Sequence, residues 1–225
     1  MATGKLHAAV REKRQDPLRW VPVEAPALDL KFWTTTDGLS VDGRRLGVSY
    51  RETIEIAKLL GGDVIPATKK LVDAIYAAAP IKTAFHSLVT ASDPDSGGTK
   101  MGSDEFASKY NADVDRQIVA KGGTPLESFA AGHDKYWLLH PRLAEKIKAT
   151  GLPAAINYGG HEAGGKPQQS VGGRHDVEHM DYSQLFRPVK RYAMRLSDGS
   201  KVDLLAWAET EEGVPSRFTE PFKTR

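Results

Sequence analysis

Apolar side chains recur at helical spacing in several stretches of the chain. The strongest pattern begins after Ser103 and ends at the glycine pair 122–123, with an apolar residue at every fourth position: Phe106, Tyr110, Val114 and Ile118. Residues 50–60, which end at another glycine pair, and residues 67–79, which end before a proline, have the same period. The pattern therefore predicts helices mainly in the first half of the chain.

Other stretches alternate or are continuously apolar, which predicts strands. Residues 28–35, LDLKFWTT, alternate and are followed by an Asp-Gly turn signal. KYWLLH at 135–140 and LPAAINY at 152–158 are typical of buried strands, and residues 141–150 predict a short helix between them. The segment SDPDSGGTKMGS, residues 92–103, predicts a solvated loop.

The clearest hairpin is predicted near the C-terminus, where residues 191–196 and 201–209 flank the turn SDGS. Helices followed by strands, without regular alternation, predict a single α+β domain with a mixed or antiparallel sheet that includes this hairpin. We expect this domain to span residues 17–208. Residues 1–16 would form a charged N-terminal arm or a surface helix, and residues 209–225 a charged tail.

Composition and charge narrow the class of protein. The 225 residues are 40% hydrophobic and 27% charged, as in an ordinary globular domain. With 31 basic and 29 acidic residues, the chain lacks the basic excess of a nucleic-acid-binding protein. No apolar run approaches the roughly 20 residues of a membrane span, and the first twenty residues lack a secretory signal. We therefore expect a cytoplasmic protein, in which histidines and carboxylates must hold any metal because cysteine is absent.

Histidines gather in the second half of the chain, where five of the seven fall close together: His133, His140, His161, His175 and His179. A single loop histidine is more often a hydrogen-bonding residue than a functional one. Residues 159–174, however, hold six glycines in sixteen positions, which predicts a functional loop or a linker. This setting favours a functional role for His161 and His175.

The segment HDVEH at residues 175–179 matches the inverted zincin order H-x-x-E-H, in which two histidines share a helix face and bind zinc. With the methionine that follows, it resembles the pitrilysin and insulinase peptidases. This interpretation makes His175 and His179 zinc ligands and Glu178 the base. Those peptidases take a further glutamate ligand far downstream in a much larger domain, whereas 46 residues follow His179 here. Zinc and no cofactor both remain open.

A second resemblance spans roughly residues 30–190. It is carried by AGHDK at 131–135, INYGGHEAGGKPQQ at 156–169 and HDVEHMDYSQLFR at 175–187. These segments resemble a family of mostly uncharacterised bacterial proteins with A-G-H-K-K-D, I-Y-G-W-H-x-x-x-G-K-P-I-Q and H-x-x-x-Y-x-D-Y-S-H-G-x-R segments. The resemblance implies site positions in this chain at Lys69, His133, Lys135, His161, Lys166, His175, Asp181, Tyr182, Ser183 and Arg187.

Two departures from that family pattern argue against the zinc hypothesis. His179 stands where the family has tyrosine, and Gln184 stands where it has histidine. The second zincin histidine is therefore not a family feature. The resemblance implies the place of a site but no reaction, so the reaction has to be inferred from the side chains.

The side chains at these positions favour acid–base or nucleophilic chemistry. Asp181 would orient His175 or His161, and that imidazole would deprotonate water, a substrate hydroxyl or Ser183. In the structural alternative, Asp181 caps the turn that follows it. The candidate catalytic residues are therefore His161, His175, Asp181 and Ser183, together with Arg187.

Cationic side chains near these residues favour an anionic substrate. Arg187, with Lys166 or Lys135, would hold a carboxylate or an oxyanion. His133 and Tyr182 complete the candidate binding residues. In the structural alternative, Arg187 forms a buried ion pair.

Two functions of different classes follow from these residues. The first is a hydrolase that cleaves amide or peptide bonds in a carboxylate-bearing substrate of the cell-wall type. The second is a non-catalytic binding or structural protein, such as a phage or envelope component, whose His-rich loop binds an anionic glycan or a partner chain. Sequence predicts neither the oligomeric state nor the substrate.

Overall fold

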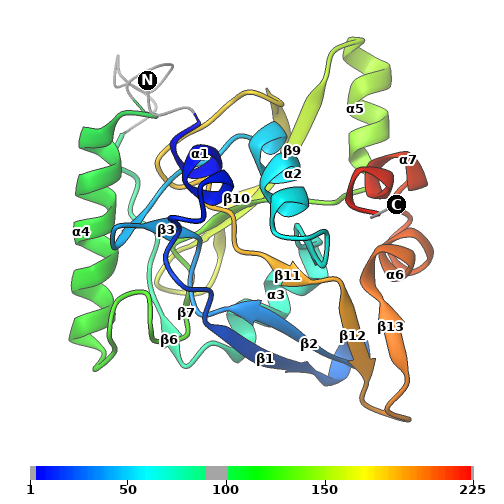
Figure 1. Cartoon of the computed structure of the whole chain (residues 1–225), viewed down its shortest axis with the longest axis horizontal. Helices are drawn as coiled ribbons and strands as arrows, with labels where there is room; N and C mark the ends of the chain where they lie inside the picture. The colour runs from blue at the N-terminus through cyan, green and yellow to red at the C-terminus, as the bar shows by residue number, and fades with distance from the viewer. Residues whose placement is uncertain (1–3, 90–100, 224–225) are drawn as a thin grey trace.

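The computed structural model in Figure 1 describes residues 4–89 and 101–223. Most of the loop predicted at residues 92–103 lies outside the described residues. Within them the fold is α+β, as the order of the patterns predicts. Helices and strands follow one another along the chain without regular alternation, and the two larger sheets are antiparallel. Helix α4 lies on the opposite side of the molecule from α5 and the C-terminal helices (Figure 1).

The larger sheet has strand β2 near its centre. Its order is β13-β12-β2-β11-β5, with β1 also paired to β2, and the neighbouring strands run antiparallel. The strands are β1(Trp20–Ala25), β2(Leu30–Thr35), β5(Val64–Ile65), β11(Val189–Lys190), β12(Tyr192–Arg195) and β13(Lys201–Asp203). Leu30 and Phe32 are fully buried, because alternate residues of β2 point into the core. The strand predicted at residues 28–35 is therefore confirmed.

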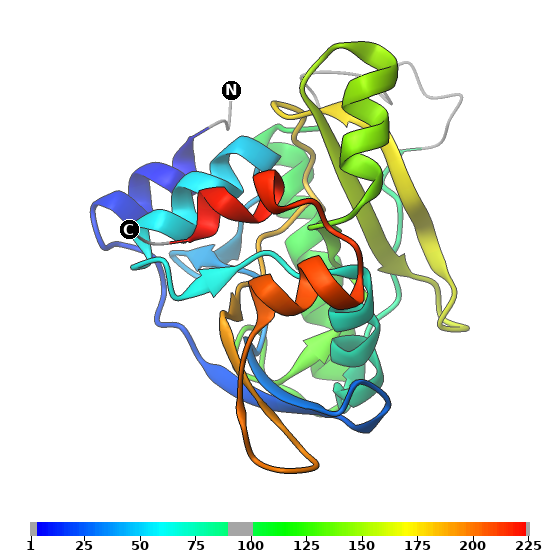
Figure 2. The same ribbon diagram turned by 90° about the vertical axis from the view of Figure 1, so that its right-hand side faces the viewer.

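The second sheet carries most of the predicted site. Strand β9(Ala154–His161) lies between β8(Lys135–Trp137) and β10(Pro167–Asp176), both antiparallel to it. Every residue of β9 is buried. Helix α5(Arg142–Thr150) packs alongside β9 and β10 (Figure 2).

The loop predicted at residues 159–174 was wrong, because the chain continues as β9, a short turn and β10. Gly159 and Gly160 belong to β9 and have φ angles of 120° and 62°. A Cβ atom on Gly159 would lie 2.6 Å from the backbone oxygen of Asp134. These glycines therefore permit close strand packing, which composition alone does not distinguish from a loop.

The remaining strands form short pairs. β3(Ser40–Val41) and β4(Arg44–Arg45) form a hairpin, and β6(Ile81–Lys82) pairs with β7(Ala130–Ala131) in parallel. The parallel pair places Thr83, directly after β6, against the carbonyl of Ala131.

The helices predicted from apolar spacing are confirmed. They are α2(Tyr50–Leu59), α3(Lys69–Ala78), α4(Asp104–Ala120) and α5(Arg142–Thr150). Ser49, Thr68 and Ser103 cap α2, α3 and α4 by accepting a bond from a backbone amide of the first turn. None of the described helices is both long enough and apolar enough to cross a membrane.

The two ends of the chain form helices. Residues of the expected arm form α1(Lys5–Arg11), whose side chains Leu6, Ala9 and Val10 are buried in the core. The predicted hairpin is present, but its second strand ends at Asp203, and residues 204–209 belong to α6(Leu204–Glu211) instead. Asp203 begins this helix because its carboxylate accepts a bond from the amide of Leu205.

The segment expected as a charged tail also packs against the domain. After α6 the chain forms α7(Ser216–Thr219) and the 3-10 turn η2(Glu220–Phe222); a similar turn, η1(Pro26–Leu28), joins β1 to β2. Phe222 is buried in the main hydrophobic cluster together with Val214. The buried side chains of Val214 and Phe222 therefore hold this largely polar segment against the domain.

Candidate functional site

The predicted site residues are divided among separate contact groups. The first, here the paired-histidine site, consists of Lys135, His175, His179, Asp181 and Ser183. The second, here the buried charge network, consists of Asp37, Arg45, His133, Asp134 and Arg187. The third, here the His161 group, consists of Lys69, Asp73, Tyr76, Tyr158 and His161.

The paired-histidine site lies on one face of the second sheet. Register pairs Trp137 and Gly172 with Asn157, and His175 with Ala155, so these residues share a face. The imidazoles of His175 and His179 stack with ring centroids 3.9 Å apart and an angle of 17°. Both rings meet Trp137 edge to face, at 6.1 and 6.4 Å between centroids.

This geometry differs from that of an inverted zincin. The predicted helix at HDVEH was wrong, since His175 lies in strand β10, one residue before its end, and His179 follows a turn. In-plane lone pairs of two nearly parallel stacked rings do not converge on one ion at the roughly 2.0–2.1 Å of a Zn–N bond. Glu178, the proposed base, binds Arg51 at the surface instead. The segment therefore lacks the arrangement that the motif requires.

Both imidazoles of the pair are held neutral. Burial, together with the neighbouring His179, lowers the pKa of His175 to about 4. Burial also lowers the pKa of His179. A neutral imidazole has one nitrogen lone pair available to accept a proton. The pair therefore offers bases that stay unprotonated at neutral pH.

A lysine–carboxylate pair lies near enough to the imidazoles for its charges to act on the pKa of both rings. Lys135 Nζ is 3.3 Å from Asp181 Oδ2, while Asp181 Oδ1 accepts bonds from the Ser183 amide at 2.8 Å and hydroxyl at 2.6 Å. Burial opposes ionisation of Asp181, but Lys135 and the Ser183 bonds outweigh it and lower the pKa of the carboxyl. Asp181 therefore holds Lys135 and Ser183, and the fully buried Ser183 hydroxyl is turned toward the carboxylate.

Several buried polar atoms around this site have no hydrogen-bond partner among the described residues. They are both amide atoms of Asn157, Nε2 of His179 and Nε2 of Gln184. Asn157 is 1% exposed, and Gln184 is fully buried. Because a buried polar group without a partner costs about 1–3 kcal/mol, such atoms are rare outside functional or hydrated sites.

The buried charge network centres on the His133 ring. Its Nε2 lies 2.7 Å from Asp134 Oδ1 and 3.0 Å from Asp37 Oδ1, and its Nδ1 lies 2.8 Å from Thr83 Oγ1. The Thr83 hydroxyl has the Ala131 carbonyl as its acceptor at 3.1 Å. This leaves Thr83 Oγ1 to accept from His133, so the imidazole donates at both nitrogens.

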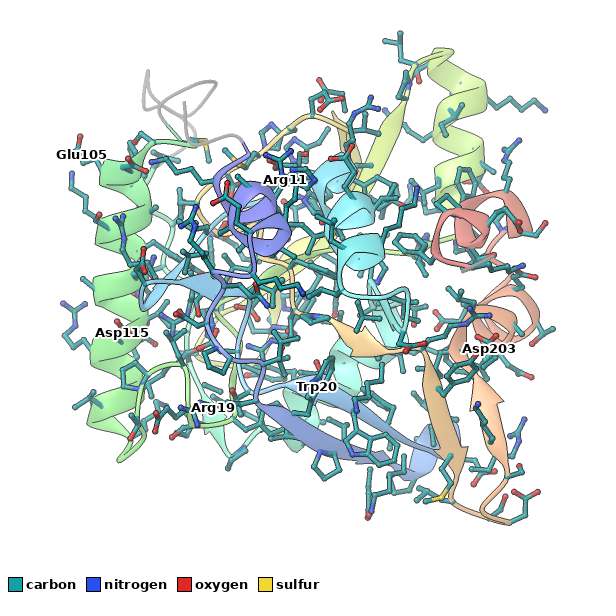
Figure 3. The ribbon with its side chains drawn as sticks, in the orientation of Figure 1. Arg11, Arg19, Trp20, Glu105, Asp115 and Asp203 are labelled. Carbon is teal, nitrogen blue, oxygen red and sulfur yellow. The ribbon has the colours of Figure 1, made fainter. Side chains whose placement is uncertain are left out.

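Two arginines complete the network. Arg45 Nη2 binds Asp37 Oδ2 at 2.6 Å, and Arg187 Nη2 binds Asp134 Oδ2 at 2.7 Å. Arg187 also donates to the carbonyls of residues 35, 36 and 130. Asp115 projects from α4 (Figure 3) and binds Arg45 Nη1 at 2.7 Å. The network thus joins β2, β4, α4, β7 and the segment before β11.

Each charged group in the network stabilises the ionised form of its oppositely charged neighbours. Burial opposes protonation of His133, but the two carboxylates outweigh it and raise the pKa of the imidazole. Burial likewise opposes ionisation of Asp37 and Asp134, while their arginine partners and His133 lower the pKa of both carboxyls.

Asp37, His133 and Asp134 also satisfy the spacing of a metal site, because one ligand atom from each lies within 4.8 Å of the others. Two guanidinium groups and a protonated imidazole already neutralise the carboxylates. Asp37, Arg45 and Asp134 were not among the residues that sequence reasoning selected. The adjacent pair HD within AGHDK was the available signal, but the acidic partner of Arg187 is 53 residues away.

The His161 group lies against α3. The His161 ring stacks on Tyr76, with centroids 3.9 Å apart, and meets Tyr158 edge to face at 6.1 Å. The Tyr158 hydroxyl donates to Asp73 Oδ1 at 2.6 Å, and Lys69 Nζ binds Asp73 Oδ2 at 2.6 Å. Burial lowers the pKa of His161, and its Nδ1 has no partner among the described residues.

The remaining candidates fall near these groups without joining their hydrogen bonds. Lys166 is exposed in the turn between β9 and β10. Tyr182 is buried, and its hydroxyl accepts a bond from the amide of Leu88 at 2.9 Å. The structure therefore brings His175, Asp181, Ser183 and Lys135 together, and places His161 and Arg187 in other groups.

Comparison with known proteins gives no relative, since no family model, no curated protein and no solved structure matches the chain.

Proposed function

We propose that the protein is a hydrolase whose centre is the paired-histidine site. The bond cleaved is an amide or peptide bond in an anionic, carboxylate-bearing substrate of the cell-wall type. The observation that carries this proposal is a pair of neutral imidazoles beside a lysine–carboxylate pair. Such a site combines a base with a cation, which are the two elements that amide hydrolysis requires.

The reaction uses water as the nucleophile. His175 accepts a proton from water as the oxygen attacks the amide carbon, and returns that proton to the nitrogen as the C–N bond breaks. The Lys135 ammonium binds the substrate carboxylate or the oxyanion that forms at the carbonyl. Asp181 acts by holding the ammonium in place. No metal enters this mechanism.

The unpartnered polar atoms near the site support an amide-bearing substrate. Asn157 offers one acceptor and two donors, and Gln184 Nε2 offers a donor. A peptide or N-acyl group presents the complementary donor and acceptor.

Binding without catalysis is the second candidate. It is favoured by the bonds of Asp181, whose two oxygens are engaged by Ser183 and Lys135. In this arrangement the carboxylate does not orient an imidazole, and the site is an anion-binding surface for a glycan or a partner chain. The resemblance to uncharacterised bacterial proteins stays a prediction and favours neither candidate.

An assay on cell-wall fragments separates the two candidates. Muropeptides are incubated with the wild-type protein, H175N and the control E178Q, and newly released amines are quantified by mass spectrometry. The control changes a neighbouring exposed residue that is paired with Arg51. We expect release by the wild type and E178Q and a loss of 100-fold or more in H175N, the typical contribution of a general base. Tight binding without release would favour the second candidate.

A further inference from the structure

Lys135 and Asp181 of the paired-histidine site come from two separate segments of the chain, and the buried charge network joins these segments. Lys135 directly follows Asp134, and Asp181 lies six residues before Arg187. Arg187 binds Asp134 Oδ2 through Nε at 2.8 Å and through Nη2 at 2.7 Å. Between these points, the Lys135 amide donates to the Ser183 carbonyl at 2.9 Å. The ion pair therefore closes a ring of contacts around Lys135 and Asp181.

Helix α4 supports the same ring from another side. The hydroxyl of Tyr110 donates to the carbonyl of His133, two residues before Lys135. The Tyr110 ring packs on Tyr182, with centroids 5.3 Å apart, and Tyr182 directly follows Asp181. Both segments that carry the lysine–carboxylate pair are thus fixed to one rigid element.

The chemistry of the network favours this role over metal binding. A cation placed between Asp37 and Asp134 would meet the guanidinium groups of Arg45 and Arg187 and the Nε2 proton of His133. Removing either arginine would leave a buried carboxylate without its guanidinium partner, which is strongly destabilising. All five side chains are at most 3% exposed, so solvent does not compensate the loss.

We propose that the buried charge network is a positioning device: by clamping Asp134 to Arg187, it fixes the Lys135 ammonium and the Asp181 carboxylate beside the two imidazoles. The catalytic role of this device rests on the proposed function. The fixed positions of Lys135 and Asp181, however, can be measured without any substrate. His133, Asp134 and Arg187 are therefore positioning residues, which touch no substrate.

The first test examines the wild-type protein. The network requires His133 to carry a proton on both ring nitrogens, facing Asp37, Asp134 and Thr83. The ring ¹⁵N chemical shifts at pH 7.5, with and without added Zn²⁺, report this directly. We expect a doubly protonated ring that zinc leaves unchanged. A ring with one bare nitrogen, or signals that move on zinc addition, would overturn the proposal.

The second test perturbs the clamp and reads the site. The charges of Lys135 and Asp181 affect the pKa of both His175 and His179. We expect R187K to move the titration midpoint of at least one of these imidazoles by about half a pH unit or more, as measured by NMR. The substitution keeps the charge but loses the several directed bonds of the guanidinium.

A matched control separates positioning from general weakening. R191K alters an ion pair in the larger sheet, where Arg191 Nη2 binds Asp203 Oδ2 at 2.6 Å; Asp203 is labelled in Figure 3. We expect both midpoints to stay unchanged in this variant. H133Q serves as the network variant if R187K does not fold. Unmoved midpoints in a folded network variant would overturn the positioning role, whereas moved midpoints in a protein that hydrolyses nothing would leave it intact and reject only the hydrolase.

Discussion

The environment of each histidine decides its charge. His133 and His175 both stand next to an aspartate in sequence, so sequence does not distinguish them. In the structure, two carboxylates face His133 and overcome its burial, which raises its pKa. Burial beside His179 lowers the pKa of His175 instead. One imidazole is thus held charged as part of the scaffold, and the other is held neutral, with a lone pair that can accept a proton.

The lowered pKa of His175 predicts a loss of stability in acid. The folded state binds the His175 proton only near pH 4, whereas the unfolded chain binds it near 6.5. The contribution of this residue to stability is therefore present above pH 6.5 and is lost as the pH falls toward 4. Denaturant unfolding at pH 7 and pH 4.5 should show a smaller loss for H175Q than for the wild type, by up to about 3 kcal/mol. Equal losses would contradict the shift.

Replacing Arg187 should lower the free energy of unfolding more than replacing an exposed arginine does. R187L removes the guanidinium partner of the buried Asp134 carboxylate, which predicts a loss of about 3–5 kcal/mol in the free energy of unfolding. R51L removes an exposed partner of Glu178 and should cost about 1 kcal/mol or less. Urea unfolding of the two variants measures the difference. Similar losses in both would argue against a closed network.

At the scale of the elements, local signals were sufficient for the helices and insufficient for the glycine-rich strands. Ser103 caps α4, and an apolar side chain recurs at every fourth position within the helix, so both signals for α4 are local in sequence. The conformation of Gly159 depends on Asp134, which lies 25 residues earlier in the chain. Residues 204–209 pack as a helix because Asp203 caps them, although their apolar run also suits a strand.

The close approach of β9 and β8 predicts a strong effect at one glycine. G159A places a Cβ atom 2.6 Å from the Asp134 oxygen at a φ of 120°, so we expect a loss of about 1–3 kcal/mol or more. G164A lies in the adjacent turn with nothing within 4 Å of its Cβ, and should be nearly neutral. Thermal unfolding distinguishes the two. A neutral G159A would mean that β9 tolerates a shift away from β8.

At the scale of the whole molecule, sequence predicted the fold class and selected candidate site residues, but it did not predict how the fold groups them. The resemblance placed His161, His175 and Arg187 together because they share one stretch of chain. The fold separates them, since His161 packs on α3 and Arg187 turns toward Asp134. Asp115, which binds Arg45, is 70 residues from it, and Asp37, which faces His133, is 96 residues from it, so no local pattern connects these pairs.

The measurement that tests the central claim most directly is amide hydrolysis by chelator-treated protein, comparing the wild type with K135M. The paired-histidine site needs no metal, and its cation is Lys135, which lies 3.3 Å from Asp181. We predict that the wild type releases amines from muropeptides after chelation, and that K135M loses 100-fold or more while keeping its fold. Full activity in K135M, or activity that the chelator abolishes, would contradict this account.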